Sequence, residues 1–523
     1  MSRAIIRNTG VVGGITLISR VTGLLREMAF AHAFGAGAFM DAFLVAFKIP
    51  NFLRRLFAEG AFSQAFVPVL SEYKVKRSPE DVKELVSAVS GTLGVVLLVV
   101  TAIGVIAAPV MVLIVAPGLT RDGGRYELAV DMLRLTFPYL LFISLTALFG
   151  GLLNTYGRFA APAFAPVLMN LVMLVFTLWL ATGSDEPGTV LAAGVFVSGL
   201  VQLLLQLPQV ARLRLLAMPR WRPMAEGVRR IGRLMLPGIL GSSMMQLSLL
   251  LDTLVASFLV TGSIAWLYYA DRLLEFPLGV FSIALATVIL PGLSTHHARA
   301  SAERFTATLD WALRLTLLLA TPAAVGLLTL AGPLTATLFG HGAFLADDVR
   351  MAAYALMTYS GGLVGFSLVK VLAPGYFARQ DVRTPVRASL IAFGVNMALN
   401  VCVVLPAASL GFPVPHVLLA ASTSVSALVN TALLWRGLAR QGVYRPAPGW
   451  GPLLARIAGA SAAMAGVVWW LAGDLSGWME AAPLVRAARC LACIAVGAAV
   501  YFASLFLLGA RYADLSSQPR PAG

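Results

Sequence analysis

The chain has 523 residues, of which 59% are hydrophobic and only 12% are charged, and its formal net charge is +15 at pH 7. Because a soluble domain carries about 25% charged residues, this composition excludes a soluble globular protein and predicts a polytopic membrane protein. The apolar runs are continuous rather than alternating, which disfavours a transmembrane β-barrel. The three cysteines, Cys402, Cys490 and Cys493, all lie in apolar segments, so no disulfide framework is expected.

Apolar runs of about 20 residues recur from one end of the chain to the other, and each is long enough to cross the hydrocarbon core as a helix. The sequence therefore predicts an all-α fold with fourteen spans. They lie at 8–34, 38–70, 84–116, 126–156, 161–183, 189–211, 234–260, 264–294, 308–331, 347–378, 384–406, 414–435, 453–473 and 485–509.

The charges of the connecting loops alternate along the chain. One set of loops is basic, including KVKR at 74–77 and a run of arginines between 212 and 233, whereas the other set includes the acidic GSDEPG at 183–188. Because cytoplasmic loops carry the excess of Lys and Arg, this pattern predicts that both termini are cytoplasmic. It also explains the high net charge without a nucleic-acid partner.

Turn residues recur at a nearly constant offset, which predicts an internal repeat. The matching pairs are Gly37 with Gly262, Pro50 with Pro277, and Pro162 with Pro385. We expect two six-span lobes related by a pseudo-twofold axis along the membrane normal, followed by a C-terminal helix pair. The alternative is coincidence among Gly- and Pro-rich membrane turns. The predicted parts are an N-terminal lobe at 1–215, a basic cytoplasmic linker at 216–233, a C-terminal lobe at 234–440, and the helix pair and tail at 441–523.

Arginines occur inside the predicted spans: Arg20 and Arg26 in the first, Arg54 and Arg55 in the second, and Arg272 in the eighth. A charge near the bilayer centre costs about 2.5–3.5 kcal/mol on insertion scales, so such residues usually face a bundle interior or a wet cavity. The planar guanidinium donates paired hydrogen bonds to phosphate and stays charged. An arginine-lined cavity predicts an anionic substrate. For Arg54 and Arg55, interfacial anchoring is the alternative.

Four carboxylates accompany these arginines: Asp41, Glu59, Asp271 and Glu275. They either balance the arginines in internal ion pairs or form a gate whose pairs break and remake between states, and Arg55 belongs to the same group. The pattern fits both roles.

Asp252 lies in the middle of the seventh span, and it has no basic neighbour in the sequence. An intramembrane carboxylate of this kind is a candidate cation or proton site. Asn396 and Asn400 lie four positions apart on one face of the eleventh span, and with Asp252 they could supply oxygen ligands for Na⁺. The alternative is that Asp252 is protonated or hydrogen-bonded inside the bundle.

The sequence contains no recognisable catalytic motif. None of the five histidines has HExxH spacing, and no phosphate-binding Walker A loop is present. We therefore expect a transporter rather than an enzyme, with no cofactor other than a Na⁺ coupling ion. The stretch at 219–234 has the pattern of a basic amphipathic surface helix, which either meets anionic lipid or reflects the usual cytoplasmic charge excess.

Four blocks of the sequence resemble one known family. They are SRVTGLLRE at 19–27, DAFLVAFKIPNFLRRLFAEGAFSQAFVPVLSEYK at 41–74, WLYYADRLLEFPLGV at 266–280 and LVKVLAPGYFARQDVRTP at 368–385. Together they are similar to the MurJ/MviN lipid II flippases of the multidrug/oligosaccharidyl-lipid/polysaccharide exporter superfamily. The resemblance implies a protein of the bacterial cytoplasmic (inner) membrane. It would move lipid II, the undecaprenyl-pyrophosphate-linked peptidoglycan precursor, from the cytoplasmic to the periplasmic leaflet by alternating access.

The resemblance also implies roles for particular residues. The essential cavity arginines of the family fall on Arg20, Arg26, Arg54 and Arg272, and the last three match the trio proposed to hold the pyrophosphate. Asp41 and Glu59 match acidic positions implicated in function or gating. Asp252, Asn396 and Asn400 are similar to a Na⁺ site of some members, although Asn400 stands where an acid is expected. The spans at 453–473 and 485–509 would help to form a groove for the lipid tail.

Membrane lipids and lipid II are the partners that the resemblance implies, and the cell-wall synthesis machinery is the protein partner to expect. Two rival functions make different predictions. A drug/cation antiporter of the same superfamily would have acidic and aromatic cavity walls. A non-transporting membrane scaffold would tolerate substitution of the arginines.

Overall fold

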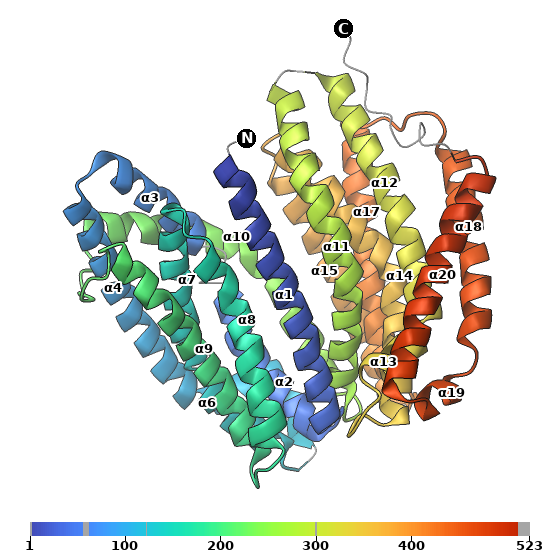
Figure 1. Ribbon diagram of the computed structural model, residues 1–523, viewed down its shortest axis with the longest axis horizontal. Coiled ribbons are helices and arrows are strands. Elements are labelled where there is room, and N and C mark those ends of the chain that lie inside the picture. Colours follow the sequence, from blue (N-terminus) through green and yellow to red (C-terminus); the bar gives the residue numbers. More distant parts are fainter. Residues whose placement is uncertain (1–2, 56–61, 122, 299–300, 511–523) are drawn as a thin grey trace. The chain divides into compact units, whose positions relative to one another are not determined.

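The computed structural model describes residues 3–55, 62–121, 123–298 and 301–510, and every regular element in these ranges is a helix. The chain divides into two compact units, Met1–Ile264 (unit 1) and Ala265–Gly523 (unit 2), which are described separately here. Figure 1 shows the helices of each unit and their labels. This confirms the predicted all-α membrane fold.

Unit 1 contains the helices α1 to α10, with one short 3-10 segment, η2, and one π-helical segment, η3. Their bounds are α1 Arg3–Phe34, α2 Ala38–Arg54, α3 Ser63–Lys76, α4 Pro79–Ile106, α5 Ala108–Val115, η2 Pro117–Arg121, α6 Arg125–Thr136, α7 Tyr139–Thr155, α8 Ala160–Val175, η3 Phe176–Ala181, α9 Pro187–Arg212 and α10 Glu226–Ser257.

Unit 2 contains α11, which starts at its boundary, and the helices that follow, including the π-helical segment η4. Their bounds are α11 Ser263–Ala298, α12 Ala302–Thr329, α13 Ala331–Leu338, α14 Ala346–Phe377, α15 Arg383–Leu399, η4 Asn400–Val404, α16 Leu405–Ser409, α17 Pro415–Arg440, α18 Trp450–Ala472, α19 Leu475–Glu480 and α20 Pro483–Leu507.

Local sequence signals explain where several helices begin. Ser78 caps α4: its hydroxyl oxygen accepts the Asp81 N–H at 3.2 Å, and the Asp81 carboxylate accepts the Ser78 N–H at 3.1 Å. This reciprocal capping box satisfies two backbone donors that a helix start would otherwise leave orphaned. Proline occupies the first helical position of α4, α9, α17 and α20, where its missing N–H costs nothing.

Helices of the described residues carry the predicted spans, and residues 56–61 of the second span lie outside the described residues. Ten helical segments there are long and apolar enough to cross a membrane. The helices outside this set that carry the remaining spans are α1, α2, α10 and α11. These four are also the helices on which the candidate arginines and Asp252 lie. The number of fourteen spans therefore remains a prediction.

Helix bounds repeat at the offset that the sequence predicted. Both ends of α12 follow the corresponding ends of α4 by the interval that separates Pro162 from Pro385, and α13 follows α5 by the same interval. The π-helical segments η3 and η4 start at Phe176 and Asn400, and the interval between them is one position longer than the interval between α4 and α12. These offsets support the internal repeat. The lobe boundaries at 215, 233 and 440 and the direction of the pseudo-twofold axis remain predictions.

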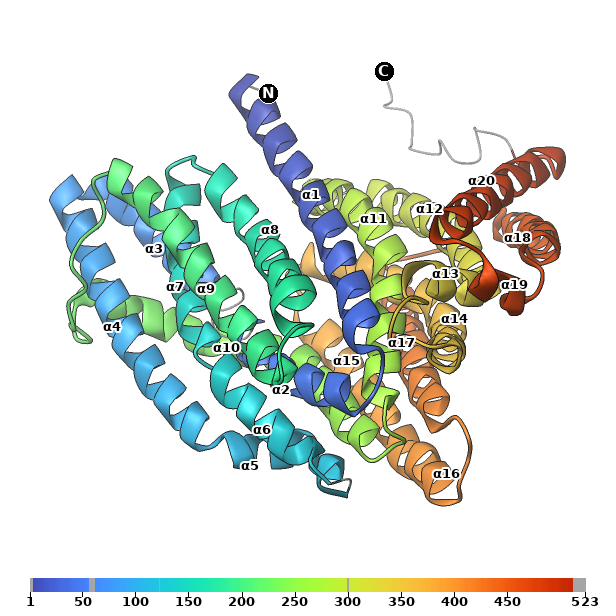
Figure 2. The same ribbon diagram turned by 60° about the horizontal axis from the view of Figure 1, so that its bottom comes forward.

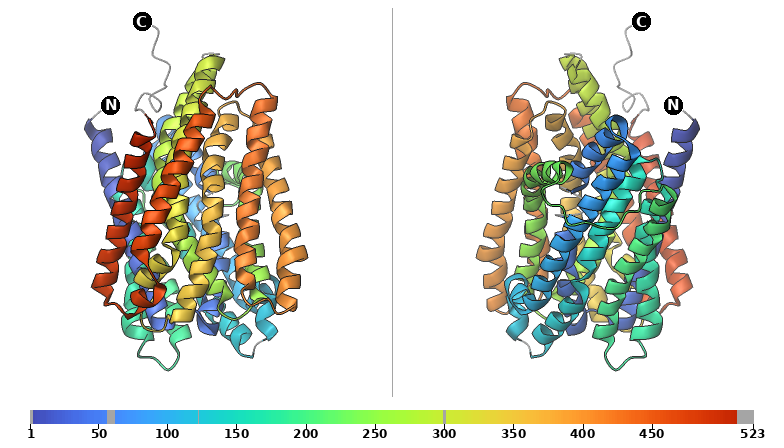
Figure 3. Two further views of the ribbon diagram at one scale, coloured as in Figure 1. Left: turned by 90° about the vertical axis from the view of Figure 1, so that its right-hand side faces the viewer. Right: turned by 90° about the vertical axis from the view of Figure 1, so that its left-hand side faces the viewer.

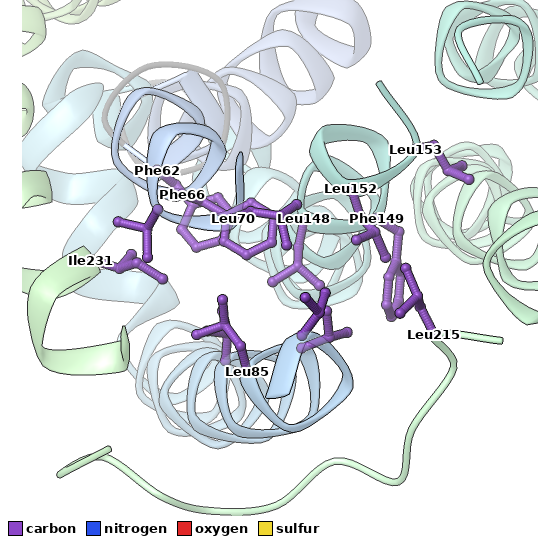
Figure 4. Close-up of a cluster of buried hydrophobic side chains, with 14 of the residues drawn as sticks. Phe62, Phe66, Leu70, Leu85, Leu148, Phe149, Leu152, Leu153, Leu215 and Ile231 are labelled. Atoms are coloured by element: carbon purple, nitrogen blue, oxygen red, sulfur yellow. The ribbon is translucent and has the colours of Figure 1, made fainter. Parts of the chain in front are cut away.

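Each unit has a core at corresponding helices. In unit 1, side chains of α3, α4, α7, α9 and α10 form a buried cluster that includes Phe66, Leu85 and Leu152, and Figure 4 shows these side chains converging. In unit 2, α12, α14 and α17 supply the equivalent cluster, with Leu309 and Tyr376 at its centre. Both clusters draw on the third, fourth and sixth predicted spans of their repeat, and other helices, such as α3 in unit 1, add side chains.

The segment between α17 and α18 is held on α12 by a buried charged cluster. Arg314 Nε donates to Asp310 Oδ2 at 2.7 Å, and Asp310 Oδ1 accepts from Tyr444 Oη at 2.7 Å and from Trp450 Nε1 at 2.8 Å. Arg314 Nη2 also donates to the Pro448 carbonyl oxygen at 2.9 Å. Burial raises the pKa of the Tyr444 phenol, and its hydrogen bond to Asp310 raises it further.

The C-terminal helix pair packs on the same unit, with α18 against α12 and α20 against α13. Figures 2 and 3 show α18 and α20 side by side. Arg486 at the start of α20 is buried, and its Nη1 donates to the carbonyl oxygens of Gly340 at 2.7 Å and Ala336 at 3.1 Å. Farther along α20, the Tyr501 hydroxyl donates to the Leu318 carbonyl at 2.7 Å. Contacts at both ends therefore attach the pair to unit 2.

Candidate functional site

Arg26 lies on α1, and its side chain is 13% exposed. Its Nη1 donates to Asn170 Oδ1 of α8 at 2.9 Å, and Nη2 forms an ion pair with Glu27. Asn170 is held in turn, because its amide nitrogen donates to the Ser19 carbonyl at 3.0 Å and to the Thr22 hydroxyl at 3.2 Å. The guanidinium is thus desolvated, balanced by one carboxylate and oriented by a neighbouring helix.

Asp41 is 1% exposed and lies in the first turn of α2. One carboxylate oxygen, Oδ2, accepts the Gly262 N–H at 2.7 Å and lies 3.5 Å from Nη1 of Arg125. Gly262 has a φ of +95°, a conformation that favours glycine. Asp41 therefore connects the start of α2, the start of α6 and the turn that precedes α11.

Sequence reasoning missed Arg125. It lies just before the predicted fourth span, where a basic residue looks like ordinary loop charge. Yet it is 5% exposed and faces Asp41. Only the buried partner distinguishes it from a loop arginine, and that partner lies on another helix.

Asp252 is half-buried on α10. It has no basic neighbour in the sequence, but the structure brings Lys48 of α2 to the adjacent residue. Lys48 Nζ donates to the Thr253 hydroxyl at 2.6 Å. This hydrogen bond connects α2 to α10 and places a positive charge beside the segment that carries Asp252.

The other candidate arginines of unit 1 are half-buried. Arg54 is half-buried, and its Nε donates to Asn51 Oδ1 at 3.1 Å. Arg55 directly follows α2 and is also half-buried. Arg20 is half-buried on α1 and has no ion-pair partner among the described residues. Glu59 lies outside the described residues.

Arg272 of unit 2 is surrounded by residues of its own helix, α11. Its Nη1 lies 2.7 Å from Oε2 of Glu275, and its Nη2 lies 3.6 Å from Oδ2 of Asp271. The guanidinium also lies over the Tyr268 ring, 5.0 Å from its centroid. With a side chain that is 30% exposed, Arg272 can meet an external anion more readily than Arg26, whose side chain is 13% exposed.

Asn396 and Asn400 are both buried in unit 2. Asn400 begins η4, and its Oδ1 accepts from the Ser422 hydroxyl of α17 at 2.5 Å. Such π-helical turns are frequent at functional sites. Within the described residues, no group of three His, Cys, Asp or Glu side chains is placed to hold a metal ion. Asn396 and Asn400 offer amide oxygens and Ser422 offers a hydroxyl oxygen, and oxygen donors of this kind suit a hard cation such as Na⁺.

Arginines and carboxylates buried in apolar helices are typical of membrane transport proteins. The fold itself is shared with a distantly similar solved structure. A solved structure described as the inward-facing conformation of a multidrug resistance MATE family transporter of the MOP superfamily aligns with a TM-score of 0.63. It is 16% identical, and the alignment covers 84% of this chain and 99% of the other.

The family is narrower than that class. A solved structure described as lipid II flippase MurJ in an inward closed conformation aligns with a TM-score of 0.79 at 25% identity, covering 96% of this chain and 99% of the other. The family model for "Lipid II flippase MurJ" matches residues 30–483. The chain belongs to the lipid II flippase MurJ family.

Two curated relatives match almost end to end. The "Probable lipid II flippase MurJ" of Vibrio cholerae is 45% identical over 99% of this chain and 98% of its own length. The "Lipid II flippase MurJ" of Burkholderia cenocepacia is 45% identical over 96% of this chain and 97% of its own.

Proposed function

We propose that this protein carries lipid II from the cytoplasmic to the periplasmic leaflet by alternating access, and so supplies cell-wall synthesis. Membership of the flippase family supports the substrate. The observation that carries the mechanism is the environment of Arg26, a guanidinium that is largely buried in a membrane helix and oriented by Asn170. Burying a positive charge in a membrane helix costs free energy. Such residues therefore usually mark a binding site or a transport pathway.

The headgroup of lipid II carries a pyrophosphate, which cannot cross hydrocarbon without losing its water shell. Arg20, Arg26, Arg54 and Arg272 replace that water by charge-assisted hydrogen bonds, while the polyprenyl tail stays in lipid. Between transport cycles, neighbouring carboxylates hold two of these arginines, Glu27 beside Arg26 and Glu275 beside Arg272. In the empty site, these carboxylates neutralise the arginines, so that no unpaired charge is buried. The pyrophosphate displaces the carboxylates when it binds.

The buried contact between Asp41, Arg125 and the Gly262 N–H is the candidate gate. The Asp41–Arg125 distance of 3.5 Å is long for a charge-assisted hydrogen bond. Such a pair can break and re-form as the helices move. We assign Arg55, Glu59 and Asp271 to the same group of gating or charge-balancing residues.

Two sources of energy fit the residues. An inside-negative membrane potential contributes about 2.3 kcal/mol per charge per 100 mV, which would draw the positively charged empty cavity back toward the cytoplasm. A Na⁺ gradient is the second source, with Asp252, Asn396 and Asn400 as ligands. The buried pair formed by Asn400 and Ser422 supports an oxygen-lined site on unit 2.

The test of the arginine site is depletion with complementation in a bacterial host. Arg26→Ala, present in the membrane at the normal level, should fail to support growth and lipid II translocation. Arg134→Ala is the matched control in the same unit, because Arg134 is exposed and paired only with Asp131 of its own helix. If Arg26→Ala supports both readouts, the pyrophosphate role of Arg26 is wrong and a scaffold role gains support.

The corresponding control for Arg272 is Arg350, which pairs with Asp347 of its own helix at the same spacing as Arg272 and Glu275. Arg272→Ala should abolish translocation, and Arg350→Ala should leave it unchanged. Equal effects would mean that the role of Arg272 is an ordinary helix ion pair.

The Na⁺ proposal has its own measurement. Translocation by the wild type should depend on external Na⁺, and Asp252→Ala or Asn400→Ala should remove that dependence. An unchanged Na⁺ dependence in both variants would exclude this ligand set, without affecting the arginine site.

A further inference from the structure

The segment that follows α9 is docked on α4 by specific contacts. The Arg220 N–H donates to the Ser87 carbonyl at 3.0 Å, and the Ser87 hydroxyl donates to the Met218 carbonyl at 2.5 Å. A Cβ on Gly91 would lie 2.3 Å from the Arg220 backbone, so only glycine allows this close approach. The segment at 213–225 is therefore an ordered part of unit 1.

Buried side chains fasten both ends of this segment. Leu215 near its start and Ile231 shortly after its end belong to the hydrophobic cluster of unit 1, where Figure 4 shows Leu215 beside Phe149 of α7. Gly227 adds a second close approach, because a Cβ there would lie 2.3 Å from Leu85 Cδ1. The anchors fix the backbone between them, and several side chains there, including Met218, Trp221 and Met224, are exposed.

The docking position lies at the boundary between the polar and apolar parts of α4. Its charged residues end at Glu84, and the helix contains no further charge up to Ile106. The uncharged stretch at 85–106 is long enough to cross the hydrocarbon core. Ser87 and Gly91 lie in the first turns of the stretch, which places the docked segment at the level of the lipid headgroups.

The outward side chains are of the two kinds that a headgroup layer accepts. Met218 is 84% exposed, Met224 is 79% exposed and Trp221 is 55% exposed. Tryptophan in particular is enriched at membrane interfaces. Basic residues surround these apolar ones and are exposed as well: Arg212, Arg214, Arg220, Arg222, Arg229, Arg230 and Arg233.

Four of these arginines form two contrasting pairs. Arg222 pairs with Glu84, and Arg230 pairs with Glu72 at 2.7 Å. Arg229 and Arg233 have no ion pair within the described residues, although they lie four positions apart on the exposed face of α10. Like charges at this spacing destabilise a helix, and an anion between them relieves the repulsion.

From this geometry we propose that residues 212–234 form a binding site for anionic phospholipid headgroups. Arg229 and Arg233 bind the phosphate, while Met218, Trp221 and Met224 enter the boundary between headgroups and acyl chains. The usual cytoplasmic charge excess requires only that arginines be present. The docked backbone adds a fixed arrangement, which makes the site specific to one place on the protein.

The test uses the full chain in nanodiscs of phosphatidylcholine that contain increasing fractions of phosphatidylglycerol with brominated acyl chains. Bromine quenches nearby tryptophans, and subtracting the signal of Trp221→Phe isolates Trp221. Juxtamembrane arginines each contribute about 1 kcal/mol to anionic lipid binding, or about fivefold. Arg229→Gln with Arg233→Gln should therefore weaken phosphatidylglycerol binding, read from the quenching curve, about 25-fold, and high salt should weaken it in the wild type.

The matched control is Arg436→Gln with Arg440→Gln. These arginines are also exposed, lie four positions apart on α17 and neighbour the exposed Trp435. This variant should leave quenching of Trp221 unchanged. The proposal is wrong if both double variants weaken quenching equally, since general charge would then account for it. It is also wrong if brominated phosphatidylcholine quenches Trp221 as well as brominated phosphatidylglycerol does.

A third outcome would overturn it in another way. Lipid II added to phosphatidylglycerol nanodiscs should leave the quenching of Trp221 unaltered. Displacement of phosphatidylglycerol by lipid II would show that the segment is part of the transport path. Because Arg229 and Arg233 are exposed, their substitution should preserve the fold, and a charge-reversed variant, Arg229→Glu with Arg233→Glu, should abolish the dependence on phosphatidylglycerol.

Discussion

The two repeats hold equivalent segments by different chemistry. In each, the chain after the sixth predicted span returns to the third, at positions that correspond under the internal repeat: Ser87 and Gly91 on α4, Asp310 and Arg314 on α12. Unit 1 uses one hydroxyl, one carbonyl and the space of a missing Cβ. Unit 2 uses a buried ion pair to which Tyr444 and Trp450 also donate.

The difference teaches where each repeat places its charge. Close packing on small residues leaves the arginines of the first segment facing outward, where they can meet lipid. The ion pair on α12 turns charge inward, and it attaches the segment that leads into α18 and the C-terminal helix pair. A buried pair of this kind is tolerated because its remaining hydrogen-bonding positions are satisfied. Docking of the equivalent connecting segment therefore leaves an exposed basic surface in unit 1 and forms a buried polar anchor in unit 2.

The largest expected effect is that of Asp310→Ala. It leaves the Arg314 charge buried without its carboxylate and removes the acceptor of Tyr444 and Trp450, which should cost about 3–5 kcal/mol of stability. The measurement is the melting temperature of the purified chain together with its abundance in the membrane. Asp131→Ala is the control, because it removes an exposed partner of Arg134 and should cost less than about 1 kcal/mol. A small loss for Asp310→Ala would show that the cluster is not an anchor.

Gly91→Ala tests the close packing in unit 1. The added methyl group would collide with the Arg220 backbone, and overpacking of this kind costs about 1–3 kcal/mol. Because alanine has a higher helix propensity than glycine, the substitution also stabilises the helix by about 1 kcal/mol, which offsets part of that loss. In Gly94→Ala the propensity gain is the same, but nothing lies within 4 Å of the new methyl group. The melting temperature should fall for the first variant and rise slightly for the second; a rise in both would contradict the docking of the segment.

Ser87→Ala should have a smaller effect. It removes the donor to the Met218 carbonyl and should cost about 0.5–1.5 kcal/mol. Hydrogen exchange at 216–222 is the sharper measurement, because loosening should be confined to the docked segment. Ser90→Ala serves as the control, since Ser90 bonds only within its own helix. If exchange rises equally in both variants, Ser87 does not hold the segment.

The smallest effect appears only at alkaline pH. Because the pKa of Tyr444 is raised above its usual value near 10, its contribution to stability is complete below that pH and is lost as the pH rises further. The stability difference between the wild type and Tyr444→Phe should therefore be constant up to about pH 10 and shrink above it. Unlike the contacts at Ser87 and Gly91, this anchor contains a group that can titrate. A difference that already shrinks between pH 8 and pH 10 would mean that the Tyr444 phenol is not enclosed as the structure indicates.

The sequence predicts the contacts of a site residue only where its interaction partner is close to it in the chain. A charge in an apolar run is visible by itself, so the arginines of α1, α2 and α11 could be predicted. The contact between Arg272 and Glu275 follows from helical spacing. Arg125 could not be found in this way, because its partner Asp41 lies on another helix. Likewise, Asp310 bonds with the distant Tyr444, and nothing local distinguishes this aspartate from a surface one.

The sequence by itself determined the membrane class, the positions of the helices and the internal repeat, because hydropathy and turn residues act over a few neighbouring positions. The family also follows from continuous motif blocks. Only the tertiary structure decided which charges are buried, which carboxylate faces which arginine, and that Ser87 and Gly91 do in one repeat what Asp310 and Arg314 do in the other. The physical reason is that the energy of a charge depends on its distance from partners and water, and distant segments of the chain set both.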